Sequence, residues 1–242
     1  MIALVLAAGL GTRFRPATLT TPKPLLPLLE RPILFRLFDH LIEEGVERFV
    51  VNTHHLADEL ARAVAGGYRG VPVAVSHEPQ ILGTAGAIRR ARDAGLLPDE
   101  RFLVVNGDVF TTFGLGRLLH ARREAGVASA LAVIPNREPA RETALWADAS
   151  GRLAALGGDA PPGTTGPWLF TGIQAANPAL LALLPEGKSE LAKDVLRPSL
   201  ERGDRAFALV PYAPPADGLW FDLGTPERLA AAEEEMRRAG LA

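Results

Sequence analysis

Apolar segments of strand length alternate with amphipathic segments of helix length through the first 105 residues of this 242-residue chain. Strand-like runs cover residues 2–6, 48–52, 71–75 and 102–105, and helical spacing of apolar residues marks 32–44, 56–65 and 84–94. This alternation is typical of a parallel sheet with helices on both faces and right-handed crossovers. We therefore predict an α/β fold with a Rossmann-like, mostly parallel sheet flanked by helices.

The pattern is looser beyond residue 108. Its periodicity predicts helices over 115–124, 191–202 and 226–239, and strands over 128–134, 168–175 and 207–211. We expect Asn177 to cap a short helix that has Pro178 at its first position, and Thr225 to cap the last helix. The stretch 157–166, GGDAPPGTTG, is rich in glycine and proline and predicts a mobile loop.

The stretch LAAGLGTRFRPATLTTPKPLLP, residues 6–27, directly follows the first predicted strand. Gly9 and Gly11 allow backbone N–H groups to approach a ligand, and a concave run of such groups binds anions. Arg13 and Lys23 add positive charge where phosphates would lie. The chain has no G-x-x-x-x-G-K-[ST] string, and a dinucleotide fingerprint that starts at Gly9 is broken by Phe14. The sequence thus predicts a nucleotide phosphate loop, with a tight glycine turn as the alternative.

Other polar residues follow the remaining strands of the first half. In open α/β sheets, ligands bind beyond the carboxyl ends of the strands. The residues at those ends are 9–13 after the first strand, 52–55 after the second, Glu78 after the third and 106–108 after the fourth. Four strand ends at one edge predict a ligand site more strongly than any single motif.

Composition restricts the class of protein. The net charge is −2, so no broad basic surface favours nucleic-acid binding. The chain contains no cysteine, which excludes disulfides, thiolate metal sites and a cysteine nucleophile. No apolar run is long enough to span a bilayer, and no leader precedes the first strand. We expect a cytoplasmic protein without membrane partners.

The quoted loop motif resembles the signature of the sugar-1-phosphate nucleotidyltransferases, which include mannose-1-phosphate guanylyltransferases and muramate-1-phosphate uridylyltransferases. The resemblance continues in LGTAG (82–86), VNGDV (105–109) and WFDLGTPE (220–227), so it covers nearly the whole chain. It implies an NTP and a sugar 1-phosphate as substrates and Mg²⁺ as cofactor. It also implies one domain over 1–242, with a nucleotide-binding half of about 1–110, a sugar-binding half of about 111–242, and no β-helix extension.

The resemblance also implies roles for individual residues. Asp108 and Asp222 would hold Mg²⁺, Lys23 would contact the α-phosphate, and Arg13 would hold the outgoing phosphates. The implied nucleotide-binding residues are Ala7, Ala8, Gly9, Gly11, Thr12, Glu78, Gly83 and Thr84. The implied sugar-binding residues are Asn106, Gly172 and Lys193. Turn aspartates and surface lysines or arginines are the alternative interpretation of the charged positions.

Glu78 suggests which nucleobase the site takes. A carboxylate only accepts hydrogen bonds, and guanine, uracil and thymine each offer a ring N–H on the edge concerned. We therefore expect GTP, UTP or dTTP rather than ATP or CTP, unless Glu78 is only a solvated residue at a strand end. The glutamate–lysine–proline string that is common in relatives is absent, and residues 157–166 take its place, so the sugar stays open.

Several interpretations remain beside this one. His54 and His55 are expected to pack or hydrogen-bond at a strand end rather than bind a metal. A non-catalytic regulatory subunit that binds a sugar nucleotide is one rival, although Arg13, Lys23, Asp108 and Asp222 are all present. A cytidylyltransferase of related fold is the other. The sequence leaves monomer and homodimer equally open.

Overall fold

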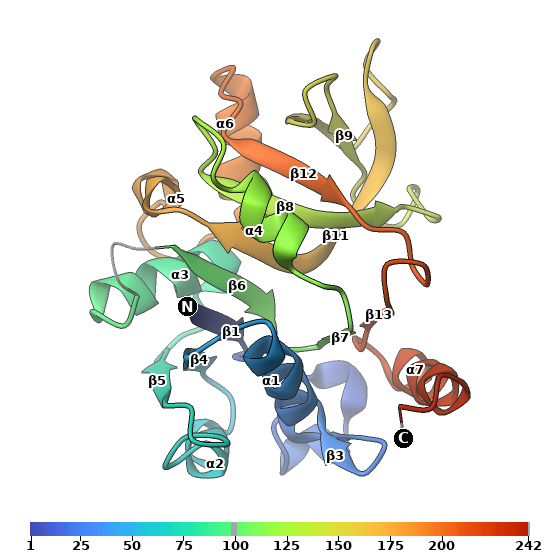
Figure 1. Ribbon diagram of the computed structural model, residues 1–242. Helices are drawn as coiled ribbons and strands as arrows, with labels where there is room; N and C mark the ends of the chain where they lie inside the picture. The colour runs from blue at the N-terminus through green and yellow to red at the C-terminus, as the bar shows by residue number, and fades with distance from the viewer. Residues whose placement is uncertain (98–100, 242) are drawn as a thin grey trace.

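The computed structural model describes residues 1–97 and 101–241 (Figure 1). Its strands are β1 (Ile2–Leu6), β2 (Pro27–Leu28), β3 (Arg31–Pro32), β4 (Arg48–Thr53), β5 (Val73–His77), β6 (Phe102–Asn106), β7 (Val109–Thr111), β8 (Ser129–Pro135), β9 (Leu145–Ala147), β10 (Leu153–Leu156), β11 (Thr165–Ala176), β12 (Phe207–Pro211) and β13 (Trp220–Asp222). Its α-helices are α1 (Ile33–Glu43), α2 (Ala57–Ala63), α3 (Gly83–Asp93), α4 (Gly116–Ala121), α5 (Pro178–Leu183), α6 (Arg197–Glu201) and α7 (Pro226–Arg238).

One large sheet organises the molecule, with strand order β10-β9-β11-β6-β1-β4-β5. The four strands of the first half, β6, β1, β4 and β5, run parallel, as the sequence predicts. β11 then joins β6 in the antiparallel direction, and β8 and β12 extend the sheet from β11. The α/β fold is confirmed, and the second half makes the sheet a mixed one.

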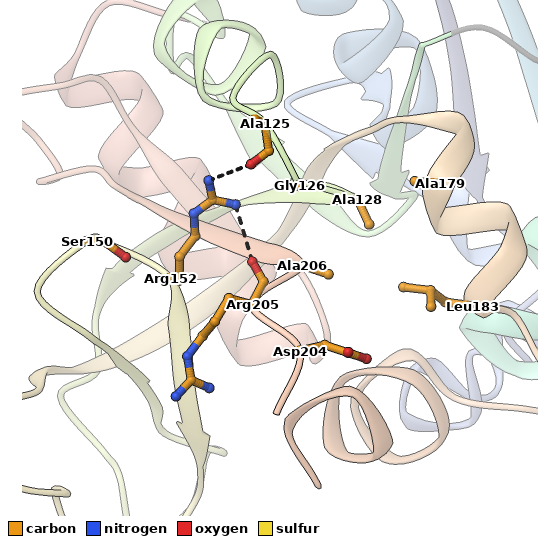
Figure 2. Close-up of a pocket in the computed structure, with 10 residues that line it drawn as sticks. All are labelled: Ala125, Gly126, Ala128, Ser150, Arg152, Ala179, Leu183, Asp204, Arg205 and Ala206. Atoms are coloured by element: carbon orange, nitrogen blue, oxygen red, sulfur yellow. Dashed lines mark hydrogen bonds between the residues drawn. The ribbon is translucent and has the colours of Figure 1, made fainter. Parts of the chain in front are cut away.

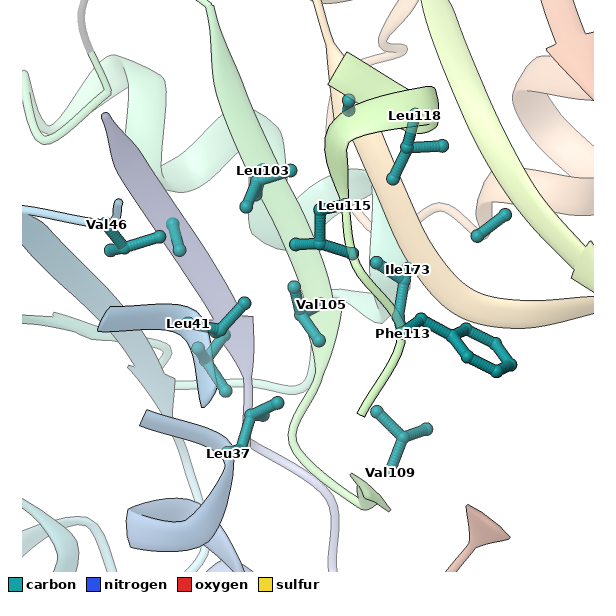
Figure 3. Packing of buried hydrophobic residues seen from close by; sticks show 14 of the residues in the cluster. Leu37, Leu41, Val46, Leu103, Val105, Val109, Phe113, Leu115, Leu118 and Ile173 are labelled. Atoms are coloured by element: carbon teal, nitrogen blue, oxygen red, sulfur yellow. The ribbon is translucent and has the colours of Figure 1, made fainter. Parts of the chain in front are cut away.

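The two faces of the sheet carry separate apolar cores because side chains alternate along a strand. In β1, Ala3 and Val5 belong to one buried cluster and Leu4 belongs to the other. Figure 3 shows part of the first cluster, with Leu37 and Leu41 of α1 on the same side of the sheet as Val105 of β6. Helices α1, α2 and α4 supply residues to this core, whereas α3 and α5 supply the other.

A third, smaller core joins the two ends of the chain. Phe14 from the loop after β1 packs with Phe110 of β7 and with Met236 of α7. The short sheet of β7 and β13 supports this contact, since Asp222 pairs with Val109 and Phe221 with Phe110 in an antiparallel register. The C-terminal helix is therefore held against the segment that follows the first strand (Figure 1).

Three local features differ from their predictions, each for a physical reason. The segment 191–202 is helical, as predicted, but it begins with a π-helical turn (Leu191–Leu196) before α6, because Pro198 cannot donate the backbone hydrogen bond that a continuous α-helix needs. The strand expected at 71–75 is Val73–His77, since pairing with β4 begins only after Pro72. Asn177 occupies the cap position of α5, but its side-chain amide donates to the carbonyls of Arg122 and Val127 instead.

The last helix agrees with its prediction. Thr225 precedes α7, and its hydroxyl accepts a hydrogen bond of 3.2 Å from the backbone N–H of Arg228. No helix in the described ranges 1–97 and 101–241 has both the length and the apolar character that a membrane span requires.

Candidate functional site

The phosphate loop, defined here as residues 7–25, leaves the carboxyl end of β1. The loop folds through three single 3₁₀ turns, at Thr12–Phe14, Ala17–Leu19 and Lys23–Leu25. The Thr18 hydroxyl donates a 2.7 Å hydrogen bond to the Gly11 carbonyl, and the Nε2 atom of His55 lies 2.8 Å from the Thr18 carbonyl. These bonds fix the curvature of the loop from inside.

The exposure of the loop residues divides them into two groups. Ala7 and Ala8 are buried where the loop leaves the sheet, whereas Gly9, Thr12 and Arg13 are exposed and Gly11 is half-buried. The exposed group is the part of the loop that an incoming anion can reach. The loop thus has the accessibility that a phosphate-binding role requires.

His54 and His55 both lie within hydrogen-bonding distance of backbone carbonyls, as expected. Nδ1 of His54 lies 2.8 Å from the carbonyl oxygen of Glu78, and His55 contacts the phosphate loop. Within the described part of the chain, no cluster of three or more His, Cys, Asp or Glu side chains could hold a metal ion.

Lys23 and Asp108 form the central ion pair of the site. Nζ of Lys23 lies 2.6 Å from Oδ2 of Asp108 and 5.4 Å from the ring centroid of Phe14. The lysine is only 8% exposed, so its ammonium needs this carboxylate partner. Asp108 keeps about a third of its side chain exposed, at 35%. The pair therefore joins the phosphate loop to the end of β6 and leaves one side of the carboxylate accessible.

Asp222 lies next to Asp108 because β13 pairs with β7. The Leu223 backbone N–H donates a 2.8 Å hydrogen bond to the Asp108 carbonyl, which fixes the two aspartate segments side by side. A Cβ atom on Gly224 would lie 2.8 Å from Oδ1 of Asp222 and 3.3 Å from both terminal nitrogens of Arg13. Arg13 thus reaches across the glycine towards Asp222, and any larger residue at 224 would displace it.

Arg228, in the first turn of α7, holds the other side of Asp222. Nη1 of Arg228 forms an ion pair with Oδ2 of Asp222, and Nη2 lies 3.2 Å from Oε1 of Glu142. The negative charge of Asp222 and the hydrogen bond to Glu142 raise the pKa of Arg228 above its ordinary value. Each predicted metal ligand is therefore balanced by a cation, Asp108 by Lys23 and Asp222 by Arg228.

A buried hydrogen-bond chain lies at the carboxyl ends of β1, β4 and β5. The Ala7 backbone N–H donates to Oδ1 of Asn52, and Nδ2 of Asn52 donates to Oε1 of Glu78 at 2.8 Å. The Leu82 backbone N–H donates to Oε2 of Glu78 at 3.0 Å. Glu78 is only 1% exposed, so both its oxygens face protein donors. These hydrogen bonds fix the backbone of residues 7 and 82, next to the predicted nucleotide-binding residues Ala8 and Gly83.

Gly83 and Thr84 begin α3 and contact the segment before the π-helical turn. The backbone N–H and hydroxyl of Thr84 both donate to Oε2 of Glu190, at 3.1 and 3.0 Å. The carbonyl of Ser189 accepts from the N–H groups of Ala85 and Gly86 at 3.0 and 3.1 Å. The N–H groups of Thr84, Ala85 and Gly86 are therefore satisfied by the protein itself.

A cavity of about 870 Å³ opens beside the two aspartates. Asn106 and Gly172, which the sequence predicts to touch the sugar, both line it. They lie together, since a Cβ atom on Gly172 would be 2.7 Å from Nδ2 of Asn106. The charged residues of its wall are Arg13, Asp108, Arg137, Glu138, Glu142, Asp222, Arg228 and Glu235. The cavity has room for a sugar phosphate and charged groups of both signs to orient it.

Lys193, the third predicted sugar-binding residue, is not among the residues that line this cavity. It is exposed on the π-helical turn, which packs near α3. Arg228 and Glu142, by contrast, line the cavity but were not predicted from the sequence. Arg228 could have been noticed because it follows Asp222 by six residues, just after the Thr225 cap.

A second pocket, of about 550 Å³, lies among α5, the start of β8 and the loop before β12 (Figure 2). Arg152 crosses its wall, and the terminal nitrogens of its guanidinium donate to the carbonyls of Ala125 and Arg205 at 3.3 Å each. Arg152 also pairs with Glu124 at 3.0 Å. Its donors are therefore used within the protein, and the pocket lacks the converging charges of the first cavity.

Solved structures show the same fold. HddC from Yersinia pseudotuberculosis complexed with GMP-PN superposes with a TM-score of 0.77, at 22% identity, covering 97% of this chain and 99% of HddC. A putative glucose-1-phosphate thymidylyltransferase from Bacillus anthracis, in complex with a sucrose, gives a TM-score of 0.79 at 20% identity and covers 98% of this chain and 96% of that one.

Curated relatives are similar along most of this sequence. The mannose-1-phosphate guanylyltransferase catalytic subunit beta of Danio rerio is 29% identical over 230 residues, which are 94% of this chain and 62% of the relative. A UTP–glucose-1-phosphate uridylyltransferase of Synechocystis is 29% identical over 237 residues, covering 93% of this chain and 60% of the relative. The chain thus spans about three fifths of the length of these relatives.

The family match covers the half of the chain that carries the phosphate loop. Residues 2–145 match the protein family described as "Nucleotidyl transferase". That segment includes β1, Lys23 and Asp108, so the central ion pair of the site lies inside it. Because the match extends over more than half of the sequence and the fold agrees, this chain belongs to the nucleotidyl transferase family.

Proposed function

We propose that this protein transfers a nucleotidyl group from an NTP to a sugar 1-phosphate, forming an NDP-sugar and releasing pyrophosphate. One observation carries the proposal: the phosphate loop, the Lys23–Asp108 pair, Arg13 and Asp222 all converge beside a cavity of about 870 Å³. The similarity to a mannose-1-phosphate guanylyltransferase and a UTP–glucose-1-phosphate uridylyltransferase supports the same reaction class.

Asp108 and Asp222 fit a magnesium ion. Mg²⁺ prefers oxygen ligands and commonly takes one or two protein carboxylates together with substrate phosphates and water. Asp108 directly precedes β7, Asp222 ends its partner strand β13, and both aspartates line the same cavity. When bound there, Mg²⁺ would neutralise charge on the α-phosphate.

The reaction needs the two substrates to be aligned and the charge of their phosphate groups to be neutralised; it does not need a protein nucleophile. An oxygen of the sugar phosphate attacks the α-phosphorus in line; this new P–O bond replaces the bond to pyrophosphate, which leaves. Lys23 is held on the loop beside Asp108, where it can stabilise charge on the α-phosphate. Arg13 is exposed on the same loop and would hold the outgoing phosphates.

For the base, we propose GTP, UTP or dTTP. The similarity to a guanylyltransferase and a uridylyltransferase supports this choice. Glu78 is 1% exposed and its two oxygens accept from Asn52 and Leu82, so it is neither a solvated residue nor an accessible acceptor for a base N–H, and it instead fixes the backbone of residues 7 and 82. Mannose 1-phosphate and N-acetylmuramate 1-phosphate are the proposed acceptors.

Pyrophosphate release tests the proposal. The five common NTPs (GTP, UTP, dTTP, ATP and CTP) are crossed with mannose, glucose, N-acetylglucosamine and N-acetylmuramate 1-phosphates, with and without EDTA. We expect turnover with one NTP–sugar pair, lost with EDTA and in Asp108→Ala. The matched control is Asp93→Ala, which removes an exposed helix aspartate that pairs with Arg89, away from the cavity. Nucleotide binding without turnover by the folded wild type would refute the proposal and indicate a regulatory subunit.

A further inference from the structure

In the described part of the chain, the cations that line the cavity of about 870 Å³ are three arginines. Arg13 belongs to the phosphate loop, Arg137 follows β8, and Arg228 stands in the first turn of α7. The sugar 1-phosphate brings a second phosphate group into this site, and Lys23 and Arg13 already have roles towards the NTP. A further cation is therefore needed for the acceptor phosphate, and Lys193 does not line the cavity.

Arg228 is the arginine that contacts a predicted metal ligand. Its guanidinium pairs with Asp222 through one terminal nitrogen and with Glu142 through the other. Its side chain is 43% exposed, so a ligand in the cavity can reach it. The Thr225 cap fixes its backbone, because the Arg228 N–H donates to the Thr225 hydroxyl. A guanidinium held this way presents a planar fork that matches a phosphate group.

The reaction geometry requires the acceptor phosphate near Asp222. The attacking oxygen must approach the α-phosphorus, and Asp108 and Asp222 are the residues that would hold a metal ion near that phosphorus. When Asp222 donates its oxygens to a divalent cation, the attraction that holds Arg228 on it weakens. A phosphate dianion arriving at the same place then supplies the negative charge that the guanidinium loses.

We propose that Arg228 binds the phosphate group of the sugar 1-phosphate, and that its guanidinium passes from Asp222 to this phosphate when Asp222 takes up the divalent cation. This inference rests on the proposed function and names the acceptor-binding residue of the same site. Glu142 keeps the second nitrogen of the guanidinium in place and acts as a positioning residue for Arg228.

Calorimetric titration with mannose 1-phosphate and with N-acetylmuramate 1-phosphate, in the presence of Mg²⁺ and a non-hydrolysable NTP analogue, measures acceptor binding without turnover. The variants are Arg228→Gln and Arg228→Lys. Arg137→Gln tests the rival possibility that Arg137, which also lines the cavity, binds the acceptor phosphate. Arg237→Gln is the matched control, because Arg237 lies on the same helix in an ion pair with Glu233 and does not line the cavity.

We expect Arg228→Gln to bind the acceptor about ten- to a hundredfold more weakly, while nucleotide binding stays unchanged. Arg228→Lys should recover part of the affinity as a point charge, and Arg237→Gln should match the wild type. Wild-type affinity in Arg228→Gln, or a loss in Arg137→Gln alone, would overturn the inference.

A second measurement needs no acceptor. Mn²⁺ titration followed by electron paramagnetic resonance, with the NTP analogue bound, should show tighter metal binding in Arg228→Gln, because Asp222 loses its competing cation. Unchanged Mn²⁺ affinity in this variant would overturn the exchange at Asp222. If no sugar phosphate binds the wild type, the proposed function fails, and the Mn²⁺ result still decides whether Arg228 and the metal compete.

Discussion

The buried hydrogen-bond chain from Ala7 through Asn52 to Glu78 has a fixed direction, and Asn52→Asp would remove the donor that faces Glu78. Nδ2 of Asn52 donates to Oε1 of Glu78 at 2.8 Å, whereas Oδ1 accepts from Ala7. An aspartate still accepts from Ala7 but places a second carboxylate against Glu78, and both positions are almost fully buried. Like charges at this distance cannot both persist, so one carboxyl must take up a proton.

The loss of folding stability in Asn52→Asp depends on the pH. A carboxyl in the unfolded chain has a pKa of about 4, so keeping one protonated at pH 7 costs about 3 pKa units, or roughly 4 kcal/mol. Because the folded variant must hold this proton and the unfolded chain need not, stability returns as the pH falls. At pH 5 the loss should be about 1.4 kcal/mol. Once protonated, the introduced aspartic acid can donate to Glu78 and restore the original bond.

Urea unfolding of the wild type and Asn52→Asp at pH 7 and pH 5 measures both losses. Adding Glu78→Gln to Asn52→Asp should restore stability at pH 7 to within about 1.5 kcal/mol of the wild type, since the glutamine amide can donate to the introduced carboxylate while its oxygen still accepts from Leu82. A pH-independent loss in Asn52→Asp, or a double variant no more stable than the single one, would contradict the hydrogen-bond directions described above.

Three other changes test separate parts of the molecule. Lys23→Gln should lower kcat by about a hundredfold or more with little change in the thermal midpoint, measured by initial rates and calorimetry; a kcat near wild type would remove Lys23 from the reaction. Thr225→Ala should cost about 1 kcal/mol in urea unfolding, because α7 loses its cap, whereas Thr225→Ser should cost less. Burial lowers the pKa of His40 below its ordinary 6.5, so the unfolded chain binds this proton at a higher pH and the wild type loses stability as the pH falls below 6.5. His40→Gln should show a smaller loss between pH 7 and about 5.5, and an identical loss would contradict this assignment.

The sequence predicts the parallel half of the fold well because its signals are local. Apolar periodicity identifies β1, α1, β4 and α3 within a few residues, since each element buries one continuous face or run. The same pattern places Gly9, Glu78 and Asp108 at carboxyl strand ends, where the structure has them. Whether these residues bind the predicted ligands is a separate question that the proposed experiments address.

Features that depend on distant partners leave no signal in the local sequence pattern. The strands β7 and β13 have three residues each and exist because they pair across more than a hundred positions of the chain. The Arg228 ion pairs join residues from three separate segments, and nothing in the local pattern around Glu142 indicates them. Pro198 was visible in the sequence, but apolar spacing alone does not distinguish a π-helical turn from an α-helix.

The short sheet of β7 and β13 has a consequence for how the protein is made. The strands that carry the phosphate loop and Asp108 are complete by residue 111, whereas Asp222 and Arg228 are synthesised more than a hundred residues later. Until those residues emerge, Asp108 has Lys23 but lacks its neighbouring carboxylate, and Phe14 and Phe110 lack their partners from the last helix. A nascent chain could therefore fold its first four parallel strands early, yet the pairing that places Asp222 beside Asp108 forms only after β13 has been synthesised.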